Sequence, residues 1–141
     1  TAGQEKFAPL IKTYYKNVAG VILIFDVTQR YTFERLHFWI NEMKKYAPSD
    51  YPISKILIAN KIDLDRKVSK EEASTLAKNY GFMYREMSIK NDINVEESLI
   101  ALAQDIYKNK EVNEGIKTSK IKYSDLKIKK GKDREYCCCI C

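Results

Sequence analysis

Three apolar stretches alternate along the chain with stretches in which apolar residues recur at helical spacing. Val18 to Val27 is apolar and largely β-branched, and Lys55 to Ala59 repeats this pattern. Such runs are typical of strands that are buried on both faces. Met83 to Met87 is a weaker third run. We therefore predict three strands, each followed by a helix.

The first predicted helix extends from about Phe33 to Tyr46, and Thr32 can cap it. Trp39 within it is most simply a core residue. Its apolar residues recur at helical spacing, at Phe33, Leu36, Ile40, Met43 and Ala47.

The second helix opens with a capping box from Ser69 to Glu72 and stops before Gly81. The last begins at Asn94, with Glu97 in its first turn. The predicted inner face of the second helix is Ala73, Leu76, Ala77 and Tyr80. The predicted apolar stripe of the last helix is Val95, Leu99, Leu102, Ala103 and Ile106.

Strands that alternate with helices predict right-handed crossovers and a parallel sheet, which is the α/β fold class. The 141 residues fit one domain. Beyond about Asn109 the apolar periodicity fades into Lys-rich sequence, which predicts a flexible tail. We therefore expect a folded unit over residues 1–109 and a basic tail over residues 110–141.

The net charge of +6 is concentrated in that tail. Residues 116–136 hold eight Lys/Arg against three Asp/Glu, a net of +5, which leaves +1 for the rest of the chain. A nearly neutral domain with a basic tail indicates an acidic partner, either a membrane or a nucleic acid. All four cysteines lie in the last five residues, whereas a disulfide framework would spread them through the fold. This favours a reducing, intracellular setting.

The sequence predicts no membrane-spanning segment and no secretory leader. No apolar run reaches the roughly 18 residues that a membrane span needs. No basic region leads into an apolar one at the N-terminus, so we expect no signal peptide. The chain begins with Thr1 rather than Met, inside what looks like a motif, and we expect the natural start to lie upstream.

Polar clusters follow two of the predicted strands. Asn60-Lys61-Ile62-Asp63 comes after the second strand, and Ser88-Ile89-Lys90 comes after the third. In an open α/β sheet, ligands bind beyond the carboxyl ends of the strands. A further polar cluster, Thr1 to Glu5, opens the chain. The sequence therefore predicts a ligand site at this edge of the sheet.

Taken together, these clusters resemble the motifs of the small GTPase superfamily, and within it the Rab proteins. Thr1 to Glu5 is similar to the end of the family's D-T-A-G-Q-E motif, Asn60 to Asp63 matches N-K-x-D, and Ser88 to Lys90 is similar to S-A-K. The residues that indicate the Rab branch are Gly3 to Phe7, Tyr14 to Lys16, Ile24 to Thr28, Phe33 and Trp39. The resemblance implies a P-loop small-GTPase domain with a parallel, three-layer α/β/α fold. This chain would hold the C-terminal part of that domain.

The resemblance also implies which residues read the base of GTP or GDP. Asp63 would accept hydrogen bonds from the guanine N1–H and 2-amino group, and Asn60 would brace the loop and the base edge. The stems of Lys61 and Lys90 would lie along the flat base faces. Ser88 belongs to the same motif, and the backbone N–H of Ile89 would meet the guanine oxygen. The family has Ala at this last position, so the larger Ile89 side chain makes its local packing an open question.

At the phosphate end, the resemblance assigns Gly3 to the γ-phosphate and Gln4 to the attacking water, as the only catalytic residue in this chain. The phosphate-cradling G-x-x-x-x-G-K-[ST] loop does not occur in the sequence, nor does a candidate first switch. The implied Mg²⁺ would be held mostly by residues upstream of Thr1. We therefore expect a GTPase in the complete protein, and no activity in these 141 residues alone.

The chain ends Cys137-Cys138-Cys139-Ile140-Cys141, which resembles the C-x-C terminus of Rab proteins. This implies prenyl groups on Cys139 and Cys141, whereas Cys137 and Cys138 are either palmitoylated or unmodified. A basic tail and two lipid chains would hold the protein on the cytosolic face of an intracellular membrane. The implied partners are exchange factors, GTPase-activating proteins and membrane-traffic effectors, met by a monomer.

Other interpretations remain at this stage. A non-catalytic, membrane-tethered interaction module would keep the fold without turnover. Zinc at the crowded cysteines lacks the spaced ligand pairs that it needs, and nucleic-acid binding by the tail lacks aromatic residues for stacking, so we expect neither. Tyr15 fits the core, while Tyr14 is a candidate effector contact. His37, the only histidine, fits a surface or packing role.

Overall fold

The computed structural model of the chain describes residues 18–47 and 53–114, with side chains to residue 110. Its three strands, β1 (Gly20–Asp26), β2 (Ser54–Asn60) and β3 (Met83–Met87), form a parallel sheet in the order β1-β2-β3. All three predicted strands are therefore confirmed. The register places Asp26 opposite Asn60, and Asn60 opposite Met87. The strands thus end level with one another.

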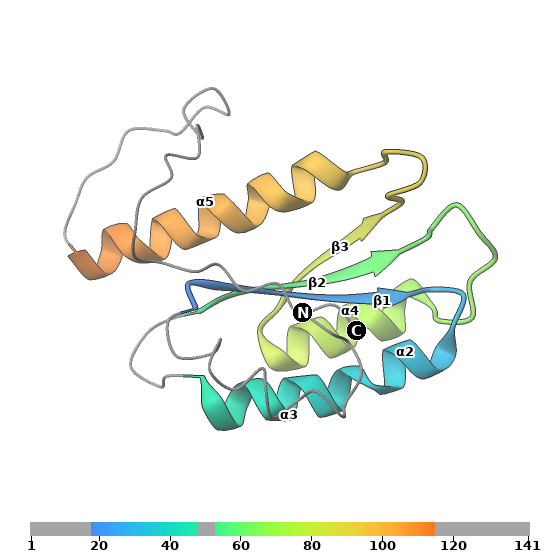
Figure 1. The fold of residues 1–141 in the computed structure, drawn as a ribbon, viewed down its shortest axis with the longest axis horizontal. Helices are drawn as coiled ribbons and strands as arrows, with labels where there is room; N and C mark the ends of the chain where they lie inside the picture. Colours follow the sequence, from blue (N-terminus) through green and yellow to red (C-terminus); the bar gives the residue numbers. More distant parts are fainter. Residues whose placement is uncertain (1–17, 48–52, 115–141) are drawn as a thin grey trace.

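Helices cover both faces of the sheet, which confirms the three-layer α/β/α fold (Figure 1). On one face lie α2 (Arg30–Glu34), α3 (Leu36–Tyr46) and α4 (Lys70–Tyr80). On the other lies α5 (Val95–Glu114), which runs back against the strand direction so that its C-terminal end lies at the sheet end opposite the carboxyl ends of the strands. Among the described residues, no helix is both long and apolar enough to cross a membrane.

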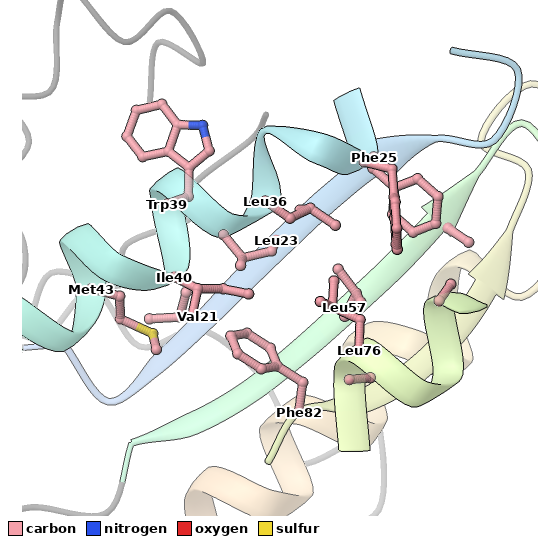
Figure 2. Packing of buried hydrophobic residues seen from close by; sticks show 14 of the residues in the cluster. Val21, Leu23, Phe25, Leu36, Trp39, Ile40, Met43, Leu57, Leu76 and Phe82 are labelled. Atoms are coloured by element: carbon pink, nitrogen blue, oxygen red, sulfur yellow. The ribbon is translucent and has the colours of Figure 1, made fainter. Parts of the chain in front are cut away.

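Two apolar clusters fill the spaces between the layers. The larger one joins β1 and β2 to α3 and α4, and Figure 2 shows Leu23, Leu36 and Ile40 directed toward one another within it. Trp39 is buried there, as predicted. The smaller cluster joins the other sheet face to α5 through Ile22, Ile56, Ile58, Met87 and Leu102. The alternate residues of β1 and β2 thus face two cores, which explains their continuous apolar sequence.

The prediction of one helix from Phe33 with Thr32 as its cap is wrong. Thr32 lies inside α2, which begins at Arg30, and only Arg35 separates α2 from α3. The Thr32 hydroxyl accepts a hydrogen bond from the Asp26 N–H (3.0 Å) and donates to the Gln29 carbonyl (2.7 Å). It therefore fastens α2 to the end of β1 instead of starting a helix. The predicted apolar stripe itself is confirmed, since four of its residues are buried and Ala47 is half-buried.

The predicted ends of α4 are confirmed. The Ser69 hydroxyl accepts a hydrogen bond from the Glu72 N–H (3.1 Å), and Gly81 ends the helix with a left-handed φ of 67°. The capping box is not closed by the Glu72 carboxylate, which instead accepts from the guanidinium of Arg30 (Nη1 to Oε2, 2.6 Å). A long-range ion pair between α2 and α4 has thus replaced the local contact that the sequence pattern predicted.

The predicted stripe of α5 is correct at Leu102 and wrong at Leu99. Leu102 is 7% exposed, whereas Leu99 is 51% exposed and the buried position in that turn is Ser98. The Ser98 hydroxyl donates to the Asn94 carbonyl (2.6 Å), so its burial leaves no unpaired polar group. The helix start at Asn94 is confirmed, because the Ser98 N–H donates to the same carbonyl (3.2 Å).

Candidate functional site

The loops that follow the three strands meet at one edge of the sheet (Figure 1). This convergence follows from the register, because Asp26, Asn60 and Met87 lie side by side as the last residues of their strands. The two motif segments, Asn60 to Asp63 and Ser88 to Lys90, therefore begin at neighbouring points.

Asp63 and Ser88 form the closest contact between the two segments. The Ser88 hydroxyl donates to Oδ1 of Asp63 at 2.5 Å, and its oxygen accepts from the Asn91 N–H at 3.2 Å. Ser88 is fully buried, and its backbone pairs with Ile93 in both directions (3.1 and 2.9 Å). Ser88 thus sits at the base of a closed turn and holds the half-buried carboxylate of Asp63 in one orientation.

Asn60 makes the second bridge between the segments. Its Oδ1 accepts a hydrogen bond from the Ile89 N–H at 3.3 Å. This is the N–H that the family resemblance assigns to the guanine oxygen, so the carbonyl of Asn60 and a guanine oxygen would draw on the same donor. The Ile89 side chain is 56% exposed. The larger residue at this position therefore points into solvent and does not crowd the turn.

Lys61 crosses from the end of β2 to the end of β1. Its Nζ lies 2.6 Å from Oδ2 of Asp26, and its backbone adopts a left-handed φ of 65°. The hydrogen bond and charge of Asp26 raise the pKa of Lys61. Partial burial alone would raise the pKa of Asp26, but hydrogen bonds from Lys61 and Thr28 outweigh it and hold that pKa below its usual value.

Asp26 belongs to the site although it lies outside the sequence motifs. The available signal was a carboxylate at the last position of a buried strand, followed two residues later by a threonine. The Thr28 backbone N–H (2.9 Å) and hydroxyl (2.7 Å) both donate to Oδ1 of Asp26. With Lys61 on Oδ2, the carboxylate is held from both sides.

Glu86 connects the two loops next to the motif residues. Its carboxylate accepts from Tyr84 Oη (2.8 Å) and Arg66 Nη2 (3.0 Å), while Lys70 Nζ lies 3.8 Å away. Burial raises the pKa of Tyr84, and the hydrogen bond to Glu86 raises it further. Arg66 belongs to the loop that carries Asp63, and Glu86 precedes Ser88 by two residues. The ion pair is therefore a third connection between the two loops, outside the motif residues.

The remaining predicted residues have different outcomes. Lys90 is exposed beside the cluster, and its placement leaves its proposed base contact untested. Gly3, Gln4, Cys139 and Cys141 lie outside the described residues, as do Tyr14 and Tyr15. In the part of the chain that the structure describes, no group of three or more histidine, cysteine or acidic side chains could hold a metal ion. The only histidine, His37, is exposed, and its ring packs edge-on against Tyr80 with centroids 6.2 Å apart.

These contacts leave acceptor capacity available at the Asp63 carboxylate. A carboxylate has about four lone-pair sites, of which Ser88 uses one at Asp63. Asp63 can therefore accept further N–H donors from a planar ligand. A parallel α/β sheet with polar loops at the carboxyl ends of its strands belongs to the class of open α/β domains, which bind ligands at that end of the sheet.

Comparison with known proteins identifies the family. The model of the Ras family matches residues 1–108, and the chain belongs to this family. The chain is also similar to the Ras-related protein Rab-8 of Diplobatis ommata, with 39% identity over 118 residues, which agrees with the resemblance to Rab proteins. The match covers 81% of this chain and 55% of that relative, so the chain spans about half the length of the curated relative that it matches.

Proposed function

We propose that the protein is a Rab-like small GTPase, which binds guanine nucleotide and hydrolyses GTP as a switch in membrane traffic. The observation that supports this most directly is the junction of Asp63, Ser88, Asn60 and Ile89 at the carboxyl edge of the sheet. It brings a fixed carboxylate and a backbone donor together in a protein of the Ras family.

Asp63 selects the base in this proposal. Guanine offers two N–H donors to a carboxylate, whereas adenine offers neither on that edge. Binding of ATP would leave Asp63 desolvated without a partner beyond Ser88. A buried charged group left unsatisfied costs upward of ~1–3 kcal/mol, which corresponds to roughly ten- to a hundredfold in affinity.

The other residues complete the site. The stems of Lys61 and Lys90 flank the base. The Ile89 N–H leaves the side-chain oxygen of Asn60 and donates to the guanine oxygen when the ligand binds. Gly3 and Gln4 serve the γ-phosphate and the attacking water. Mg²⁺ is the metal that phosphoryl transfer requires, and residues upstream of Thr1 would supply most of its ligands.

The cellular role follows from the tail and the family. Prenyl groups on Cys139 and Cys141 and the basic residues of 116–136 hold the protein at the cytosolic face of an intracellular membrane. Exchange factors and GTPase-activating proteins set its nucleotide state, and effectors bind the GTP form. The domain acts as a monomer and contacts no nucleic acid.

A second candidate function is a membrane-tethered interaction module without turnover. The observation that favours it is the absence of a G-x-x-x-x-G-K-[ST] segment from the 141 residues. Single-turnover GTP hydrolysis by the full-length natural gene product distinguishes the two. Release of phosphate that is abolished by Gln4→Leu supports the GTPase, and binding without phosphate release supports the module.

The test of base selection is Asp63→Asn in the full-length gene product. An amide replaces one acceptor with a donor, so we expect guanine nucleotide to bind roughly ten- to a hundredfold more weakly and xanthine nucleotide to bind more tightly. Affinities for GDP and XDP are measured by calorimetry. The matched control is Asp65→Asn, an exposed carboxylate of the same loop, for which we expect wild-type affinities. An unchanged preference for guanine in Asp63→Asn would contradict the assignment.

A further inference from the structure

The contact between Asp26 and Lys61 has no role in the base recognition proposed above. It joins the end of β1 to the residue after β2, over a distance of 2.6 Å between Oδ2 and Nζ. The Asp26 side chain is 15% exposed, whereas that of Lys61 is 51% exposed. The acidic partner is thus largely but not fully buried, and the lysine reaches to it from the surface.

The carboxylate of Asp26 is itself fixed before it meets Lys61. Both the N–H and the hydroxyl of Thr28 donate to its Oδ1, which leaves Oδ2 directed at the lysine. The Asp26 N–H donates to the Thr32 hydroxyl, so the backbone at this point is also tied to α2. A charged acceptor with this many fixed contacts can position a flexible side chain without moving toward it.

Lys61 needs such an anchor. Its left-handed φ of 65° is an unfavourable conformation for a residue with a Cβ. A free lysine side chain also loses up to about 2 kcal/mol of rotamer entropy when it is ordered. The ion pair orders the ammonium end and the backbone holds the other end, so the four-carbon stem is stretched between β2 and β1.

We propose that Asp26 is a positioning residue for nucleotide binding, which orders the stem of Lys61 in advance so that one wall of the base slot exists before the ligand arrives. This inference rests on the proposed function, since it assigns the stem of Lys61 to the face of a guanine base. It adds a residue to the site that acts through Lys61 and does not touch the ligand.

The proposal separates affinity from base choice. Loss of Asp26 frees the stem of Lys61, and the ligand then has to order it. Asp63 and Ser88 are untouched, so the hydrogen-bond readout of the base remains. Asp26→Asn therefore weakens GDP and XDP to the same extent, whereas Asp63→Asn changes their ratio.

The test uses the full-length gene product and a fluorescent GDP analogue. We expect Asp26→Asn to release the analogue about tenfold faster than wild type, because changes at one site act mostly on dissociation rates. The GDP-to-XDP affinity ratio stays at the wild-type value. Thr28→Val, which keeps the N–H donor to Asp26 and removes the hydroxyl donor, gives a smaller acceleration in the same direction. Asp65→Asn is the matched control with no acceleration.

A second background shows whether Asp26 acts through Lys61. Lys61→Met keeps an unbranched stem and removes the ammonium group, so Asp26 can no longer form the ion pair at this position. In this background we expect Asp26→Asn to change the release rate less than twofold. An acceleration as large as that in the wild-type background would show that Asp26 acts by a general effect on folding, and would overturn the proposal. So would an unchanged release rate for Asp26→Asn in the wild type.

The outcome also distinguishes this proposal from the proposed function. If wild type prefers guanine and Asp63→Asn abolishes the preference, the base site stands and the result for Asp26 is judged alone. If wild type shows no preference for guanine, the proposed function fails and the role of Asp26 fails with it. Thermal unfolding of each variant without nucleotide gives the fraction folded, and release rates are compared for the folded fraction.

Discussion

At the scale of single residues, Glu86 connects two loops that would otherwise meet only through the motif itself. It accepts hydrogen bonds from Tyr84 and Arg66 while most of its side chain is buried. Burial by itself would raise the pKa of Glu86, but these hydrogen bonds and the nearby charge of Arg66 outweigh it and keep that pKa low. The ionised form is therefore favoured by folding.

This predicts a pH-dependent contribution to stability. Because the folded pKa lies below the unfolded value of about 4.3, the contribution is complete above that pH and is lost as the pH falls through the lower, folded pKa. We expect Glu86→Gln to lower the free energy of unfolding by roughly 1–2 kcal/mol at pH 7, and by much less near pH 3. Urea unfolding at both pH values measures this.

The control for Glu86 is Glu96→Gln, an exposed acid in the first turn of α5. Its effect at pH 7 is expected to stay within about 0.5 kcal/mol, as for most surface substitutions. A Glu86→Gln effect of equal size at pH 7 and pH 3 would show that the lost contribution is packing and not the ionised carboxylate.

At the scale of elements, α5 shows what helical spacing can and cannot predict. The helix is predicted in the correct place but with the wrong residue buried, because Leu99 is more apolar than Ser98 whereas Ser98 is the buried residue. We expect Leu102→Ala to destabilise the fold by about 2–4 kcal/mol, since Leu102 fills the cluster with Ile22 and Met87. Leu99→Ala should cost less than about 1 kcal/mol.

Urea unfolding of the two variants checks this pair, and each serves as the matched control of the other. Equal losses would mean that the helix is rotated relative to its described position. The chemical change is identical in both, so the difference reports burial alone.

Much of the fold and part of the site could be predicted from the sequence. Continuous apolar runs identified the strands, and strand ends identified where Asn60, Asp63 and Ser88 would meet. The contact of Asp26 with Lys61 could not be predicted, because it depends on the sheet register and on a left-handed backbone at a lysine. The start of α2 could not be predicted for a similar reason, because the Thr32 hydroxyl bonds to the backbone at the end of β1 and does not cap a helix.

At the scale of the whole molecule, β1 is one of the two edge strands of the sheet among the described residues. It is seven residues long, and its side chains are mostly buried. Because a long, apolar edge strand presents backbone N–H and C=O groups to other chains, it favours pairing with them. We expect the 141-residue chain, expressed alone, to self-associate and to bind a fluorescent GTP analogue weakly. Size-exclusion chromatography and titration test this. A soluble monomer with nanomolar affinity would contradict the prediction.

The tail gives a second prediction at this scale. One acyl chain holds a protein on a membrane only marginally, and a second chain makes attachment lasting. We expect the protein from eukaryotic cells to carry two prenyl groups, on Cys139 and Cys141, and the double variant Cys139→Ser, Cys141→Ser to leave the membrane fraction. Intact-mass analysis and fractionation measure both. The control is Cys137→Ser, Cys138→Ser, which keeps both prenyl groups.

The direction of α5 determines how far its C-terminal end lies from the loops that carry the motif residues. The helix is 20 residues long, which corresponds to about 30 Å, and it begins beside the carboxyl edge of the sheet and ends at the opposite edge. It therefore separates the sheet end that carries the motif loops from the opposite end of the domain by the length of one helix. Under the proposed function, a partner that opens the loops around Asp63 would act one helix length away from the C-terminal end of α5. Under the proposed function, we expect that a partner of the loops around Asp63 and a partner at the far end of α5 can bind at the same time.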